Sequence, residues 1–242
     1  MLKIRASSLG LIMSEPKSID PSFLVGEYAE LYKKRSKTED DQKALKPLWD
    51  KTLSAGAKSF IGELAKQFVY GFEPEVTTKY MEKGLIVEDQ SIDLYNSVFF
   101  SSHKKNAERR TIGHLTGEPD IVDIRSREII DIKSAWSLDT FPAIRSAGES
   151  SLYEWQGRAY MKLWAGEVDR FVLAYCMVST PEELVGREPE DLHFVDHIDP
   201  TLRVTRLTFD RCLEKEALID VKLKEANRYF ELVIEQITEE HA

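Results

Sequence analysis

The sequence predicts an α/β fold in which a central mixed β-sheet is flanked by helices on both faces. Helical patterns dominate residues 1–100, short runs of branched apolar residues follow within 109–209, and a helical pattern lies between two of those runs. Layers of helix packed against sheet are the arrangement that this order favours. A C-terminal helix over 210–240 completes a chain that we expect to be one domain, 1–242.

The composition is typical of a folded globular protein. Hydrophobic residues make up 42% and charged residues 31% of the chain, and the formal net charge of −9 excludes a protein coated with basic residues. The two cysteines fit a reducing cytoplasm, and they exclude a zinc ribbon or a four-thiolate iron–sulfur cluster built by this chain alone. No run approaches the about 18 apolar residues of a membrane span, so we expect a cytosolic protein.

The first hundred residues are expected to form an extended arm followed by helices. One helical turn is predicted at about 7–13, and Pro21-Ser22 begins an amphipathic helix to about residue 34. The charge-rich stretch 33–51 is interpreted as a solvated loop or helix face, with a basic lip on a phosphate backbone as the functional alternative. Longer helices are expected over 52–70 and 74–99.

The pattern changes to that of strands after residue 110. Residues 120–124 and 128–135 predict a hairpin, which is joined through 125–128. A helix over 151–165 and a buried strand over 168–178 follow. Residues 180–200 contain three prolines and are expected to form a loop, 202–209 alternate like a strand, and Asp210 is the expected N-cap of the last helix.

The hairpin contains the residues best suited to chemistry. Its sequence, GEPDIVDIRSREIIDIKSAW over 117–136, includes Asp120, Asp131 and Lys133. The last two share one face of a strand, and a two- or four-residue turn would bring Asp120 to the same face. Such charges are unfavourable when buried without partners, and carboxylate oxygens suit Mg²⁺ or Mn²⁺. Lys133 would then orient or deprotonate an attacking water, whereas ordinary surface charges are the alternative interpretation.

The Pro-Asp…Asp-x-Lys pattern resembles the nuclease superfamily named for its Pro-Asp…Asp/Glu-x-Lys motif, which has a restriction-endonuclease-like core. More closely, the chain is similar to the phage-type alkaline exonucleases, the lambda-exonuclease and YqaJ-like group of the RecB-like branch. Further segments within 4–165 carry this resemblance. They are KYMEKGLIVED at 79–89, YEWQGRAYMKLW at 153–164 and IRASSLGLIM at 4–13.

The resemblance implies a metal-dependent deoxyribonuclease. One or two Mg²⁺ ions, or Mn²⁺ as a substitute, would be held by Asp120, Asp131, Glu88 and the Ile132 carbonyl. In this interpretation Gly84, one helical turn before Glu88, allows the helix to approach closely. Lys133 would position the attacking water, and Gln156 would orient the lysine or the phosphate.

The same resemblance supplies candidates for contact with DNA. Ser7 and Ser8 match an Ala-Ser segment that lies near the DNA end in such enzymes, and Arg5 is beside them. Tyr160 and Trp136 are further candidates, since Trp136 could stack at a frayed end. A core position is the alternative for both aromatic residues.

The implied reaction is hydrolysis of phosphodiester bonds at the ends of linear double-stranded DNA, 5′ to 3′, in phage-type recombination. A ring-shaped homotrimer and a single-strand annealing partner are implied as well. The chain begins almost at the Ala-Ser segment, so basic residues upstream that grip a 5′-phosphate have no counterpart, and polarity is less firmly implied than nuclease activity. The alternatives are a structure-specific or single-strand endonuclease of the same superfamily and a catalytically inactive DNA-binding module.

Other clusters receive structural interpretations. His193 and His197 have a spacing that can bind zinc on a helix, but DLHFVDHIDP lacks helical periodicity. His114 is expected to be a satisfied polar neighbour of the hairpin. Basic clusters at 33–35, 104–105, 109–110, 125 and 127 could line a DNA groove or simply be solvated.

Overall fold

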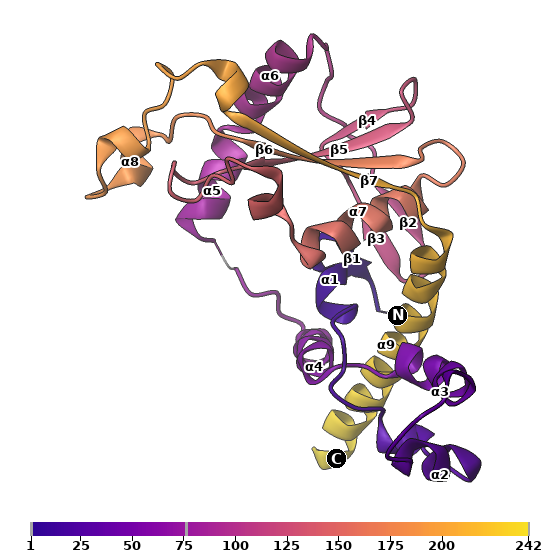
Figure 1. Cartoon of the computed structure of the whole chain (residues 1–242). Coiled ribbons are helices and arrows are strands. Elements are labelled where there is room, and N and C mark those ends of the chain that lie inside the picture. The colour runs from indigo at the N-terminus through magenta and orange to yellow at the C-terminus, as the bar shows by residue number, and fades with distance from the viewer. Residues whose placement is uncertain (1, 76, 242) are drawn as a thin grey trace.

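The computed structural model describes residues 2–75 and 77–241 (Figure 1). A four-stranded mixed sheet of order β4-β5-β6-β7 lies at the centre, with β5 and β6 parallel and the other pairs antiparallel. Its strands are β4 (Ile121–Asp123), β5 (Glu128–Ser134), β6 (Arg170–Cys176) and β7 (Val204–Asp210). Helix α6 (Glu88–Phe99) covers one face and α7 (Ser151–Leu163) the other, which confirms the predicted fold class.

Alternation along the strands explains why both faces of the sheet are covered. Ile130 and Ile132 of β5 belong to the same apolar cluster as Ile92 and Tyr95 of α6. Ile129 belongs to the larger cluster on the α7 side. Because successive side chains of a strand point to opposite faces, the even-numbered positions of β5 face α6 and the odd-numbered ones face α7.

A smaller sheet anchors the N-terminal segment beside the hairpin. Its order is β1-β3-β2, with strands β1 (Ile4–Arg5), β2 (Arg110–Ile112) and β3 (Leu115–Gly117). Strand β1 is parallel to β3. The extended arm was predicted, but this sheet was not, because its strands are too short to show a period of two. Strand β3 leads directly into the hairpin and so ties the first residues to it.

The other helices surround the two sheets (Figure 1). They are α1 (Leu9–Ile12), α2 (Glu27–Lys33), α3 (Glu39–Lys51), α4 (Ala55–Tyr70), α5 (Lys79–Ile86), α8 (Glu182–Val185) and α9 (Leu213–Glu240). Helix α4 packs along α9, where Phe68 meets Phe230 edge to face. Across residues 2–75 and 77–241, no helix is both long and apolar enough to cross a membrane.

Several helix boundaries differ from the prediction for local reasons. The helix expected over 74–99 is divided at Val87 into α5 and α6, and residue 76 lies outside the described part of the chain. The helix expected from Pro21 begins only at Glu27, because Gly26 has a φ of 57°. Thr38 starts α3 with a capping box inside the charge-rich stretch.

The C-terminal helix also begins later than predicted. Asp210 is not its N-cap, because this residue is the last one of β7 and pairs in register with Arg170 of β6. Helix α9 instead begins after Cys212, whose side chain makes no capping hydrogen bond.

The close crossing of α7 over β6 requires glycine at position 157. A Cβ added there would lie 2.0 Å from Cδ1 of Phe171, which is fully buried. We expect Gly157→Ala to lower the free energy of unfolding by about 1–3 kcal/mol, as overpacking of a core does. Urea denaturation followed by circular dichroism measures this change.

Gly62→Ala is the matched control for this substitution. An added Cβ at Gly62 on α4 would meet nothing within 4 Å in the described part of the chain, so alanine should stabilise the helix by about 0.5–1 kcal/mol. If Gly157→Ala unfolds at the wild-type urea concentration, the crossing is not tightly packed.

Candidate active site

The β4–β5 hairpin brings Asp120 and Asp131 together. Asp123 pairs with Glu128, which leaves a four-residue turn, and continuation of this register places Asp120 opposite Asp131. The Oδ2 atom of Asp120 accepts a hydrogen bond of 2.6 Å from the Ile132 amide. The hairpin and the shared face predicted for its charged residues are therefore confirmed.

Helix α7 contributes the partners of the second aspartate. The Nε2 atom of Gln156 donates to Asp131 Oδ1 over 3.0 Å and to the Tyr160 hydroxyl over 3.0 Å. Lys133 Nζ lies 2.6 Å from Asp131 Oδ2 and 4.8 Å from the centre of the Tyr153 ring. In this structure Gln156 contacts Asp131, whereas the sequence analysis expected it to orient the lysine or the phosphate. Sequence reasoning missed Tyr153, although its place one helical turn before Gln156 was a usable signal.

Burial strongly affects the ionisation of this group. Burial and the neighbouring charge of Asp131 together raise the pKa of Asp120 to about 7, although the Ile132 amide and the charge of Lys133 act in the opposite direction. Burial is the largest single effect and lowers the pKa of Lys133, but the contact with Asp131 and the charges of Asp131 and Asp120 together outweigh it, so the net shift is upward. Asp120 therefore loses its proton less readily than a free carboxyl group does.

The donor atoms fit a divalent cation. Asp131 Oδ2 is buried and accepts no hydrogen bond from the described residues, since its contact with Lys133 lacks hydrogen-bond geometry. The N–H and C=O of one strand residue point to the same side, so the Ile132 carbonyl is directed, like its amide, towards Asp120. A carbonyl and carboxylate oxygens of this kind suit Mg²⁺ or Mn²⁺.

Glu88 does not complete this group by itself. It is the first residue of α6, and its carboxylate forms an ion pair with Lys105. Among the side chains that the structure describes, no three of the His, Cys, Asp and Glu type gather closely enough to hold a metal ion. Gly84 is not on the same helix as Glu88, and within the described chain an added Cβ would meet nothing within 4 Å. Its expected role in close approach is therefore wrong.

A buried lysine holds α5 against the hairpin. Lys83 is fully buried, and its Nζ donates to the carbonyls of Ala135, Trp136 and Val178 over 2.6, 3.0 and 3.0 Å. These carbonyls follow the ends of β5 and β6. Lys83 therefore attaches α5 to both strands, just before the turn at Val87 where α6 starts. Sequence reasoning missed this residue, because one lysine in a short amphipathic helix looks like a surface residue.

The two candidate aromatic residues occupy the core positions that the sequence analysis left as alternatives. Trp136 is 6% exposed, its Nε1 donates to Glu188 over 3.0 Å, and its ring packs edge to face on His193. It offers no free face to a base, so the stacking role expected for it is corrected. Tyr160 is 5% exposed and reaches the site through its hydroxyl, which accepts from Gln156.

The Ala-Ser segment lies next to the start of the hairpin. Ser7 is exposed and Ser8 is half-buried in the 3-10 turn that precedes α1. The Arg5 side chain is largely exposed and forms an ion pair of 3.2 Å with Glu73. Arg5 and Ser8 line a hollow of about 650 Å³ together with Thr116 of β3, the strand that leads to the hairpin.

The histidines do not form a metal pair. His193 is fully buried, with Nδ1 3.1 Å from the Thr180 hydroxyl and Nε2 3.2 Å from Glu188. It is therefore a structural residue that links two loops. The Nδ1 atom of His114 lies 3.0 Å from the carbonyl of Leu2, as expected of a satisfied neighbour of the hairpin.

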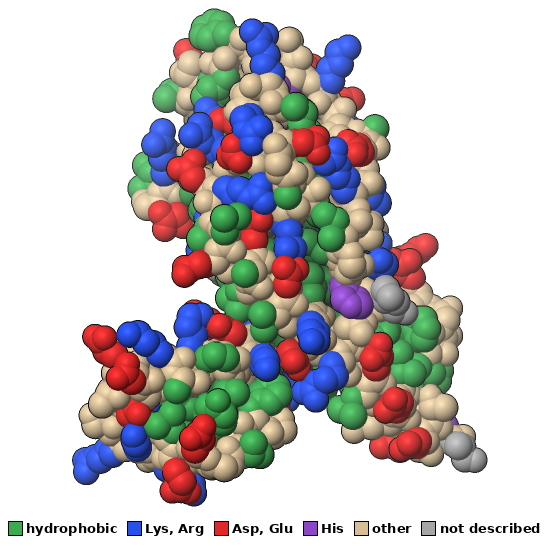
Figure 2. All heavy atoms as spheres, turned by 90° about the vertical axis from the view of Figure 1, so that its right-hand side faces the viewer, with side chains coloured by type: hydrophobic (Ala, Val, Ile, Leu, Met, Phe, Trp, Pro, Cys, Tyr) green, Lys and Arg blue, Asp and Glu red, His purple; other side chains and the backbone are tan. Residues whose placement is uncertain are grey.

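Many residues of the basic clusters, for which a DNA groove and simple solvation were both left open, have acidic partners. Figure 2 shows acidic and basic side chains interspersed over the face in view. The pairs include Lys34–Asp41, Lys105–Glu88, Arg109–Glu118, Arg110–Glu167 and Arg127–Asp169. A groove of one sign is therefore not formed by these clusters.

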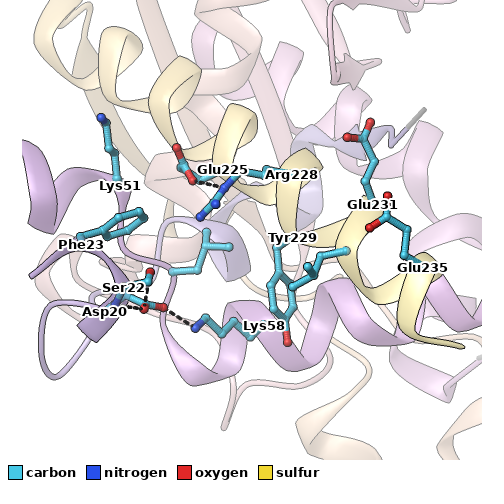
Figure 3. Close-up of a pocket in the computed structure, with 12 residues that line it drawn as sticks. Asp20, Ser22, Phe23, Lys51, Lys58, Glu225, Arg228, Tyr229, Glu231 and Glu235 are labelled. Atoms are coloured by element: carbon cyan, nitrogen blue, oxygen red, sulfur yellow. Dashed lines mark hydrogen bonds and ion pairs between the residues drawn. The ribbon is translucent and has the colours of Figure 1, made fainter. Parts of the chain in front are cut away.

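A separate hollow of about 480 Å³ lies between α9 and the N-terminal segments (Figure 3). Two of the cations that line it, Lys58 and Arg228, are paired with Asp20 and Glu225. The hairpin carboxylates do not line this hollow, so it is separate from the candidate active site.

Comparisons with known proteins agree with the fold. No protein-family model and no curated protein matches this chain. A solved phage-related exonuclease from Haemophilus somnus 129PT is similar, with 28% sequence identity and a TM-score of 0.79 over 98% of this chain and 96% of that one. The alkaline exonuclease LHK-Exo from Laribacter hongkongensis has the same fold, with 14% identity and a TM-score of 0.62 over 99% of this chain and 93% of that one. The resemblance to phage-type alkaline exonucleases is confirmed.

Asp120 should make the protein less stable as the pH rises in the presence of a chelator. Its pKa is about 7 in the folded protein and 3.8 for the unperturbed group. Between these two pH values the folded state binds more protons than the unfolded state. The stabilisation that protonated Asp120 gives the folded state is therefore complete below the pKa of the unfolded chain, and it is lost as the pH rises through the pKa of the folded protein. We expect Asp120→Asn to raise the thermal midpoint in EDTA progressively from about pH 5 to about pH 8.

Asp123→Asn provides the opposite sign as a control. Hydrogen bonds from the Ser126 side chain and the turn amides lower the pKa of Asp123, so this substitution should reduce stability near neutral pH. If Asp120→Asn follows the wild-type pH dependence, Asp120 is ionised as easily in the folded as in the unfolded chain.

Proposed function

We propose that this protein is a metal-dependent exonuclease that hydrolyses phosphodiester bonds at the ends of linear double-stranded DNA, 5′ to 3′. The observation that carries the proposal is the group formed by the buried Asp131 with the half-buried Asp120 and Lys133. It stands in a fold shared with the Haemophilus somnus exonuclease over 98% of the chain. Paired carboxylates beside a lysine are suited to metal-assisted hydrolysis of phosphodiesters.

The residues around the centre would divide the work as follows. Asp120, Asp131 and the Ile132 carbonyl would hold Mg²⁺, or Mn²⁺ in its place, with Glu88 as a further candidate ligand. When bound, such a metal polarises the phosphate and lowers the pKa of a bound water. Lys133 lies beside Asp131 and over an aromatic ring, where it can orient the attacking water and stabilise charge on the phosphate.

Gln156 and Tyr160 keep this arrangement in one geometry. Gln156 donates to Asp131 from a buried position and is in turn bonded to Tyr160. A fixed amide of this kind prevents the carboxylate from rotating, which preserves the direction of both oxygens. Its removal should weaken metal binding and hydrolysis without unfolding the hairpin.

The DNA end would lie along the Ala-Ser segment. Guanidinium and hydroxyl groups are common phosphate partners, and Arg5, Ser7 and Ser8 present such groups next to β3. We further propose a ring-shaped homotrimer, which would keep an acidic protein on DNA through a basic channel. Under this proposal the protein acts in the cytoplasm of a bacterial or phage-infected cell, with a single-strand annealing protein as partner in recombination.

Degradation of linear duplex DNA with Mg²⁺ is the principal test. We expect Lys133→Ala to reduce the rate by about 10²–10³-fold, because the charge that develops on phosphate loses its partner. Lys46→Ala is the control, since Lys46 is an exposed α3 residue whose ion pair, among the residues that the structure describes, is with Asp50. Cleavage of a covalently closed circle would favour the endonuclease alternative. Binding of Mn²⁺ and DNA without cleavage would favour the inactive module.

End-labelled duplexes test polarity and the role of Arg5. We expect a 5′ label to be released before a 3′ label, and Arg5→Ala to raise KM for DNA more than it lowers kcat, because Arg5 contacts substrate away from the reacting phosphate. Duplexes with 5′-phosphate and 5′-hydroxyl ends should be compared. Earlier release of the 3′ label would reverse the proposed direction.

A further inference from the structure

Lys105 directs its ammonium into the acidic side of the candidate active site. Its Nζ forms an ion pair with Glu88, whose side chain is 20% exposed. The hydrogen bond to Glu88 raises the pKa of Lys105, and the charges of Glu88, Asp120 and Asp89 add to this effect. The ammonium is therefore held on Glu88, and the next residue along, Asn106, is bonded to the backbone of Asp120. A divalent cation bound by Glu88 would be attracted to the same carboxylate.

The backbone that carries Lys105 is held on both sides. The amide of Asn106 donates to the carbonyl of Asp120 over 2.7 Å. On the other side, Asn96 Nδ2 of α6 donates to the carbonyl of His103 over 2.9 Å. These two hydrogen bonds fix the backbone of the segment that runs from α6 to the start of the hairpin. The position of the Lys105 ammonium is consequently set by its side chain, which is half exposed and can leave Glu88 without a change in the fold.

The adjacent lysine shows that this placement is specific to position 105. Lys104 is exposed, and it forms no ion pair with the residues that the structure describes. Two neighbouring lysines of one extended segment thus differ in direction: one meets the solvent and the other the carboxylates. This difference makes Lys104 a matched control for the charge of Lys105.

We propose that Lys105 competes with the divalent cation for Glu88 and, once displaced, contacts a phosphate of the bound DNA strand. The inference rests on the proposed function, because it takes the two aspartates as part of a metal site. The Glu88 carboxylate cannot bind the Lys105 ammonium and the divalent cation equally well at the same time. Metal and DNA both favour the state in which Lys105 has left Glu88, so each should strengthen the binding of the other by the same factor.

Calorimetric titration of Mn²⁺ into chelator-treated, dialysed protein tests the competition. Lys105→Met keeps the length of the side chain but removes the charge. We expect it to bind Mn²⁺ at least about threefold more tightly than the wild type, as the loss of a competing ion pair predicts. Lys104→Met removes the same charge one residue away and should keep the wild-type affinity, while Lys105→Arg should stay close to the wild type.

A double-mutant cycle identifies Glu88 as the group for which they compete. With Glu88→Gln in place, the further change Lys105→Met should no longer tighten Mn²⁺ binding. A phosphorothioate duplex that resists cleavage should tighten Mn²⁺ binding to the wild type more than to Lys105→Met, because the lysine carries the coupling. An equal effect of the duplex on both proteins would remove the phosphate contact from the inference.

The outcomes separate this inference from the proposed function. One contrary outcome is that the wild type binds Mn²⁺ and both methionine variants have the wild-type affinity. Another is that Lys104→Met tightens Mn²⁺ binding as much as Lys105→Met does. In either case the metal site stands, but Lys105 is not a specific competitor for it. If the wild type binds no Mn²⁺, the proposed function fails and the inference with it.

Discussion

The hydrogen bond from the Ile132 amide to Asp120 Oδ2 holds this half-buried carboxylate beside the buried Asp131 at the edge of the central sheet. Most of the surrounding structure serves to make this tolerable. Helix α7 supplies an amide for Asp131, β5 supplies Lys133, and the small sheet fixes the chain just before Asp120. A protein without need for these charges would be more stable with apolar residues there. The retained cost is a physical argument for function at this place.

Close packing of α7 on the sheet makes the contact with Asp131 possible. Gly157 allows the helix to lie directly on Phe171, and the adjacent Gln156 is thereby brought within 3.0 Å of the carboxylate. A longer distance between helix and strand would break the hydrogen bond between Gln156 and Asp131 and leave both groups buried and unsatisfied. Packing in the core and geometry in the site are therefore the same feature of this fold.

Three lysines show how an acidic protein uses cations internally. Lys83 donates to three backbone carbonyls and fixes α5, Lys133 neutralises Asp131, and Lys105 neutralises Glu88. The first is fully buried, and burial lowers its pKa to about 8. The second is held at the centre, and only the third is exposed enough to move. This order of increasing exposure fits a structural role for Lys83, a chemical role for Lys133 and the proposed role of Lys105 in metal and DNA binding.

The sequence by itself determined the fold class, the hairpin and the shared face of Asp131 and Lys133. Strand periodicity is a local property, so a single sequence is enough to read it. The turn length, which the sequence left open, was decided by the structure and brings Asp120 opposite Asp131. Only the tertiary structure decided the partner of Glu88, the burial of Trp136 and the role of Lys83. These depend on the break of the helix at Val87 and on contacts between segments far apart in the chain, which no local pattern encodes. Packing geometry, rather than residue type, selected which of several equivalent lysines and aromatic residues came to face the site.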